Sequence, residues 1–160
     1  MSNIEIVEIS TDHKSWIQKI LTRYWGTSKL VSRGNIYEGT SLPGFIAMID
    51  HEPVGLCTYK IVQNQCEIIT LNSLKENLGI GGALITEVIQ MAKKEKFRRV
   101  WLITTNDNLH ALGFYQKRGF TIAELYPNAI QKSRQLKPEI PLIGENGIPL
   151  RDELELEINL

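Results

Sequence analysis

The chain has 160 residues with 18 basic and 18 acidic side chains, so its formal net charge is zero. This length suits one domain, and the 42% of hydrophobic residues is enough for a substantial core. The balanced charge argues against a nucleic-acid-binding protein, which usually carries a basic excess. No apolar run reaches the roughly 18 residues of a membrane-spanning helix, and the N-terminus shows no secretory signal pattern. We therefore expect a cytoplasmic protein with no nucleic-acid or membrane partner.

The first half of the chain predicts a strand, a helix and a three-stranded meander. Residues 4–9 alternate between apolar and polar, as a strand does. Apolar residues recur at helical spacing over 16–24, after the plausible capping residues Thr11 and Asp12. The polar, glycine-bearing stretch 25–35 is interpreted as a loop or a second short helix. The meander strands are expected over 44–50, 54–62 and 66–73.

The second half alternates helices with strands. Helices are expected from a glycine-rich turn to about Lys96 and over 107–118, and strands over 99–105, 120–126 and 152–160. A short helical candidate at 128–136 opens the long connection between the last two strands. This order is typical of a single mixed α/β domain over residues 1–160, with a central sheet of about six to seven strands flanked by helices.

Three glycines crowd the start of the helix in "GIGGAL", at Gly79, Gly81 and Gly82. Each costs a helix interior roughly 1 kcal/mol relative to alanine, but glycine lets a ligand approach the backbone. Free amides at a helix N-terminus suit a phosphate group. A P-loop is excluded because no Gly-Lys pair occurs, and a dinucleotide fingerprint is weak because the third glycine is out of register. A coenzyme A pyrophosphate cradle and simple close packing of strand and helix remain as alternatives.

The helix expected over 107–118 favours the coenzyme A cradle over simple close packing. The spacing N-x-x-A-x-x-x-Y-x-x-x-G-F is formed by Asn108, Ala111, Tyr115, Gly119 and Phe120. Together with "GIGGAL" about 30 residues upstream, this pattern resembles the GNAT superfamily of acyl-CoA-dependent N-acetyltransferases. The resemblance spans nearly the whole chain and implies a GNAT acyltransferase fold. It also implies acetyl-CoA as the co-substrate and acetyl transfer to a primary amine by direct attack in a ternary complex.

The resemblance assigns coenzyme contacts to two parts of the chain. Backbone groups of Leu71, Asn72 and Ser73 would pair with the pantetheine arm, which Asn108 would also contact. The pyrophosphate would lie on the amides of Leu78, Gly79, Ile80, Gly81, Gly82 and Ala83. The chain departs from the family pattern before these glycines, where Glu76 replaces a Gln or Arg and the loop is about two residues shorter.

Two side chains are expected to move protons. Tyr115 matches the family's tyrosine near the coenzyme sulfur, where a phenol can protonate the leaving thiolate; alternatively, it is a core aromatic. Glu67 is the candidate base, acting through water, or else an ordinary strand residue. Strict alternation would place it with Ile69 and Leu71 on one semi-buried face. Asn108 has an alternative role as a helix cap.

Other reactive or charged residues receive no catalytic role. The three histidines lie in unrelated elements without ligand spacing, so no metal is expected. Cys57 and Cys66 are interpreted as reduced, buried thiols rather than a disulfide or a nucleophile. The charged run 93–99 suits the solvated C-terminal end of a helix better than a nucleic-acid patch.

The acceptor is expected to be a small-molecule amine, with a protein amino group as an alternative. A non-catalytic acyl-CoA-binding regulator is a further alternative, and the chain is expected to be a monomer or homodimer. The connection over 127–150 is long for a compact domain, and such segments are often functional. We expect it to form part of the acceptor site, or else to be an ordered surface loop. Its charged residues that would meet a polar substrate are Arg134, Lys137, Glu139 and Glu145.

Overall fold

The computed structural model describes residues 3–160, which divide into two compact units. The first comprises residues 3–28, 38–100 and 159–160, and the second comprises residues 29–37 and 101–158. The main sheet has seven strands, in the order β1-β4-β5-β6 in the first unit and β7-β9-β8 in the second. The predicted α/β class and strand number are therefore confirmed, whereas the single domain over 1–160 stays a prediction.

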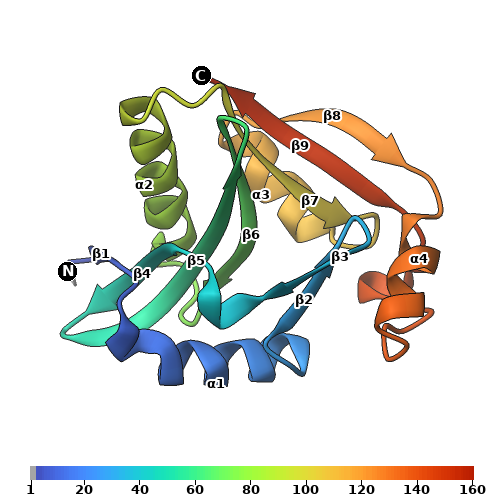
Figure 1. The fold of residues 1–160 in the computed structure, drawn as a ribbon, viewed down its shortest axis with the longest axis horizontal. Coiled ribbons are helices and arrows are strands. Elements are labelled where there is room, and N and C mark those ends of the chain that lie inside the picture. Colours follow the sequence, from blue (N-terminus) through green and yellow to red (C-terminus); the bar gives the residue numbers. More distant parts are fainter. Residues whose placement is uncertain (1–2) are drawn as a thin grey trace. The chain divides into compact units, whose positions relative to one another are not determined.

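The first unit is an antiparallel meander covered by a helix (Figure 1). Its elements are β1 (Glu5–Glu8), α1 (Lys14–Trp25), β4 (Gly44–Ile49), β5 (Glu52–Val62), β6 (Gln65–Ser73) and α2 (Ile80–Lys94). Helix α2 packs against β4, β5 and β6. Gly55 allows this close packing, because a Cβ there would lie 2.5 Å from a methyl carbon of Ile80. The predicted meander and the helix after the glycines are confirmed.

Two predictions for the first 40 residues are wrong. Thr11 and Asp12 do not cap α1; they lie in a short 3-10 turn, Thr11–His13, in front of it. The stretch interpreted as a loop or helix instead leads into a hairpin, β2 (Lys29–Ser32) and β3 (Asn35–Glu38). Its two-residue turn has positive φ at Arg33 (50°) and at the glycine that follows (75°). Each of these strands has two apolar residues side by side, in KLVS and NIYE, so neither shows the alternation that predicts a strand.

The second unit holds this hairpin together with the C-terminal half of the chain. Its other elements are most of β7 (Arg99–Thr105), α3 (Leu109–Lys117), β8 (Thr121–Tyr126), α4 (Ala129–Leu136) and most of β9 (Glu153–Asn159). Strands β8 and β9 are antiparallel neighbours, α3 packs against β8, and α4 packs against β2 (Figure 1). These helices and strands were all expected from the sequence, with bounds that differ by one or two residues.

The long connection before β9 is anchored by the residue pair that follows β7. Asp107 is buried, and its carboxylate accepts hydrogen bonds from the Thr105 hydroxyl and from the backbone N–H of Glu145 (2.8 Å). Gly144 allows this approach, because a Cβ there would overlap the Asp107 carboxylate. The side chain of the neighbouring Asn106 donates a hydrogen bond to the carbonyl of residue 149 and accepts hydrogen bonds from the backbone N–H groups of residues 151 and 152. These polar contacts tie the part of the connection that follows α4 to the residues that follow β7.

Replacing Asp107 with alanine should lower the free energy of unfolding by about 2–3 kcal/mol, because hydrogen bonds to a buried charge are lost and two donors are left unpaired. Urea denaturation of the variant measures this loss. Glu139→Ala, an exposed change in the same segment, is the control and should stay within about 0.5 kcal/mol of the parent. Equal urea midpoints for the two variants would contradict the role of Asp107 in anchoring the connection.

Candidate active site

Helix α2 begins at a glycine-rich end that no side chain of the described residues caps. Gly79 precedes the helix with a left-handed φ of 76°, and a Cβ at this position would meet nothing within 4 Å. The first bond of the helix runs from the Ala83 N–H to the Gly79 carbonyl (3.0 Å). The amides of Ile80, Gly81 and Gly82 therefore have no partner within the helix. Uncapped amides at the positive end of a helix form a binding site for an anionic group.

The chain reaches this end from β6 through an exposed loop. Leu71, Asn72 and Ser73 pair with residues 55–57 of β5, so the predicted pantetheine strand is ordered. Glu76 and Leu78 are exposed in the loop that follows. The Asn72 side chain is buried, and its Oδ1 atom has no hydrogen-bond partner among the described residues. A buried amide oxygen of this kind is a ready acceptor for an N–H of a ligand.

Glu67 lies on β6 and is 8% exposed. The register places it opposite Lys60 and places Thr70 opposite Thr58, whereas Ile69 has no partner on β5. Paired residues lie on the same face, so this bulge puts Glu67 on the face of Thr58 and Thr70, whose hydroxyls are 2.6 Å apart. The predicted common face of Glu67, Ile69 and Leu71 is therefore wrong, because strict alternation fails across the bulge.

The two cysteines are buried free thiols. Burial and then the negative charge of Glu67 raise the pKa of the Cys66 thiol to about 12. Burial likewise raises the pKa of Cys57. Both side chains are therefore protonated at neutral pH, which does not suit a nucleophile.

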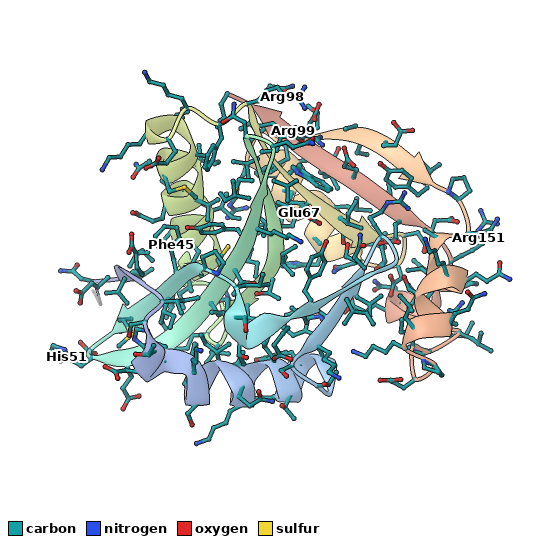
Figure 2. All side chains as sticks on the ribbon, viewed as in Figure 1. Phe45, His51, Glu67, Arg98, Arg99 and Arg151 are labelled. Carbon is teal, nitrogen blue, oxygen red and sulfur yellow. The ribbon has the colours of Figure 1, made fainter. Side chains whose placement is uncertain are left out.

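The basic run at the end of α2 has a partly structural role. Figure 2 shows Glu67 along the hairpin of β5 and β6, with Arg98 and Arg99 near its turn. The Arg98 N–H donates to the carbonyl of Asn64 (2.8 Å), and the Arg99 Nε donates to the Gln65 side chain (2.8 Å). These contacts fix the end of the hairpin.

Tyr115 and Asn108 belong to the second unit, whereas Glu67 and the residues of the predicted cradle belong to the first. Tyr115 is 7% exposed, and its ring packs edge-on against Phe114 (5.1 Å between centroids) and Phe120 (5.4 Å). Asn108 caps α3, because its Oδ1 accepts the N–H of Ala111 (3.0 Å). Each residue thus has a structural role, and these contacts leave the Asn108 amide nitrogen available as a donor.

The family model of the acetyltransferase (GNAT) family matches residues 11–120 of this chain. The chain belongs to the GNAT acetyltransferase family. The match includes the N-terminus of α2 and the helix of Tyr115, which are the two parts of the chain that suggested the family.

The GNAT chain is similar to proteins of known sequence and structure over most of its length. It is 45% identical over 142 residues to the protein YdhI of Bacillus subtilis strain 168, covering 88% of this chain and 89% of YdhI. An IAA acetyltransferase from Bacillus cereus matches with a TM-score of 0.74 at 22% identity, over 99% of this chain and all of that one. A GNAT acetyltransferase from Elizabethkingia anophelis, with acetyl-CoA bound, matches with a TM-score of 0.71 at 23% identity, over 99% of both chains. These structures share the fold.

One charged residue of the long connection in the GNAT chain, Arg134, has partners within the connection itself. The Arg134 guanidinium donates to the carbonyls of Ile140 (3.3 Å), Pro141 (2.7 Å) and Leu150 (2.6 Å), so it holds its own segment together. The expected contacts of Arg134, Lys137, Glu139 and Glu145 with a substrate stay predictions. The side chains of Glu139 and Glu145 are exposed. Sequence reasoning missed two buried glutamates on β9, Glu153 and Glu155, although "ELELE" shows charged residues alternating with leucine.

Across residues 3–160 of the GNAT chain, no three His, Cys, Asp or Glu side chains are grouped as a metal ion would require. Within the same residues, no helix is both long and apolar enough to cross a membrane.

Proposed function

We propose that this GNAT chain transfers the acetyl group of acetyl-CoA to a primary amine of a small molecule, by direct attack within a ternary complex. The observation that carries the proposal is the uncapped, glycine-rich N-terminus of α2, within a region that matches the GNAT family. Two pyrophosphate charges suit its free amides and the helix dipole. The pantetheine arm then runs along the end of β6, where the unpaired Oδ1 of Asn72 can accept one of its amide N–H groups.

Acetyl transfer requires that one proton leaves the amine and that another reaches the thiolate. The neutral amine attacks the thioester carbonyl carbon, the C–N bond forms, and the C–S bond then breaks. A backbone N–H near Leu71 to Ser73 stabilises the charge that develops on the carbonyl oxygen. Before the attack, Glu67 takes a proton from the ammonium form of the acceptor through water. As the C–S bond breaks, Tyr115 donates its phenolic proton to the departing thiolate, and the second proton that the nitrogen loses returns to the phenolate through solvent.

Replacing Glu67 with glutamine should lower the rate of acetyl transfer at pH 7 by about 10²-fold, because the general base is lost. The deficit should shrink as the pH rises toward the pKa of the acceptor, since an amine that is already neutral needs no base. Rate measurements over a pH series test this, with Glu8→Gln, exposed on β1, as the control. A deficit that does not change with pH would contradict the role of Glu67.

A catalytically silent acyl-CoA-binding protein is the second candidate. The structural roles of Tyr115 and Asn108 favour it, because packing and capping alone account for their positions. Incubation of the purified chain with acetyl-CoA and a panel of amines and peptides separates the candidates. Thiol release that depends on a small amine supports the proposed enzyme, release only with peptides supports a protein acetyltransferase, and binding without release supports the silent protein.

A further inference from the structure

Strand β9 carries an acidic face in the second unit. Side chains alternate along a strand, so Glu153 and Glu155 share one face, and they are only 3% and 9% exposed. Tyr126 on β8 lies directly opposite Glu153, and its hydroxyl donates to Glu155 Oε1 (2.9 Å). Glutamates are almost never this deeply buried unless a cation or several donors accompany them. The face therefore favours contact with a positive charge.

The turn of the β2–β3 hairpin covers this face. The backbone N–H of Arg33 donates to the Glu153 carboxylate. The Arg33 guanidinium carbon lies 3.4 Å from the centroid of the Tyr126 ring. A cation at this distance is attracted by the ring face, and the carboxylates beneath add to the attraction. The arrangement of a carboxylate, an aromatic ring and a cation is thus already present in the molecule.

Arg33 adopts a backbone conformation that is unfavourable for a residue with a side chain. Its φ of 50° is left-handed, and a turn of this type favours Asn, Asp or Gly at that position. This conformation is unfavourable for a residue with a Cβ. The contacts of the Arg33 side chain offset this cost. The residue itself is exposed, so the guanidinium can leave the ring toward solvent.

Two buried polar atoms beside this turn have no hydrogen-bond partner among the described residues. One is Oε1 of Glu153 and the other is the hydroxyl oxygen of Ser32, the residue before Arg33. Burial raises the pKa of Glu153, an effect that the Arg33 N–H and guanidinium oppose. Unpaired buried oxygens cost free energy, and each can accept an N–H. A ligand group with several N–H donors suits such oxygens.

We propose that Glu153, Ser32 and Tyr126 form a subsite for a primary ammonium group of the acceptor, and that the Arg33 guanidinium competes with this ammonium for the same ring and carboxylate. An ammonium group has three N–H donors, which suit Glu153 Oε1 and the Ser32 hydroxyl, and its charge suits the Tyr126 ring. The inference rests on the proposed function, because the ammonium belongs to the amine that is acetylated. The substrate class is then a small amine that carries a positive charge.

Calorimetric titration of the full chain at pH 7 with 1,5-diaminopentane and 2-phenylethylamine tests the subsite. The uncharged probes 1,5-pentanediol and 2-phenylethanol serve as counterparts. We expect at least one amine to bind and its alcohol not to bind. Glu153→Gln should weaken amine binding about 10-fold or more, because the ammonium loses the negative charge that pairs with it. Glu8→Gln is the control, since Glu8 is exposed and lies on β1 in the first unit; it should change the affinity less than about twofold.

Two further variants separate ligand binding from a purely structural role. Ser32→Ala leaves the charges of the chain unchanged and should weaken amine binding by about 10-fold or more, because one hydrogen bond from the charged ammonium is lost. Arg33→Gln should tighten amine binding, because it removes the competing cation. A structural partnership of Arg33 with Glu153 would instead lower the melting temperature of Arg33→Gln and leave amine binding unchanged.

The subsite is overturned if neither amine binds the parent chain, or if Glu153→Gln and Glu8→Gln weaken binding equally. It is also overturned if Arg33→Gln lowers the melting temperature without tightening amine binding. Titration of the same samples with acetyl-CoA distinguishes this failure from failure of the proposed function. Binding of acetyl-CoA without binding of either amine would contradict only the subsite. Binding of an amine without binding of acetyl-CoA would support the subsite and contradict the proposed function.

Discussion

Replacing Tyr115 with phenylalanine should lower the turnover of acetyl transfer by about 10²- to 10⁴-fold, the range expected for loss of a general acid. Phenylalanine keeps the ring that packs edge-on against Phe114 and Phe120, so the fold and the affinity for acetyl-CoA should change little. The variant removes only the hydroxyl. Steady-state rates of thiol release, measured with saturating amine, report the effect on turnover.

The matched control for this variant is Tyr24→Phe, which removes a hydroxyl from an exposed tyrosine of α1. It should leave turnover within about twofold of the parent, because substitutions of exposed residues outside a binding site usually have small effects. If Tyr115→Phe also turns over at a rate close to the parent, water rather than Tyr115 protonates the thiolate. In that case the aromatic cluster is the main role of Tyr115.

Replacing Gly81 with valine should weaken acetyl-CoA binding by about 10²-fold. A branched side chain in the first turn of α2 would keep a phosphate away from the adjacent amides, and two charge-assisted hydrogen bonds lost or stretched account for this factor. Valine is at least as good a helix former as glycine, so α2 should stay intact. Calorimetric titration with acetyl-CoA measures the dissociation constant, and circular dichroism checks the fold.

Gly113→Ala is the control for this experiment, because Gly113 is another helical glycine and a Cβ there would meet nothing within 4 Å. It should bind acetyl-CoA as the parent does. A folded Gly81→Val variant with unchanged affinity for acetyl-CoA would remove the glycine-rich end of α2 from the coenzyme site. The glycines would then serve only the packing of α2 on the sheet.

Local patterns predicted most of the secondary structure. The meander, α2 and β9 follow from apolar patterns over six or more residues, which is long enough for the period to be clear. The hairpin of β2 and β3 was missed because neither strand alternates between apolar and polar residues, and because its turn begins with Arg33 rather than Asn, Asp or Gly.

The side-chain environment of the candidate site was harder to predict. The bulge at Ile69 changes the face on which Glu67 lies, and nothing in the local pattern marks where a register shifts. Arg134 and Glu153 acquire their roles from contacts with residues far away in the sequence, Leu150 and Arg33 respectively. The positions of the backbone amides in the predicted cradle were easier to predict. They depend on where the glycines lie and where the helix starts, and not on side-chain partners.

The most direct test of the proposed function measures free thiol and N-acetylated product together, after incubation of the purified chain with acetyl-CoA and a panel of small primary amines. The proposed function predicts thiol release that requires a particular amine, with one molecule of N-acetylated amine formed for each thiol released. Tight binding of acetyl-CoA with no amine-dependent thiol release, from any amine in the panel, would contradict it.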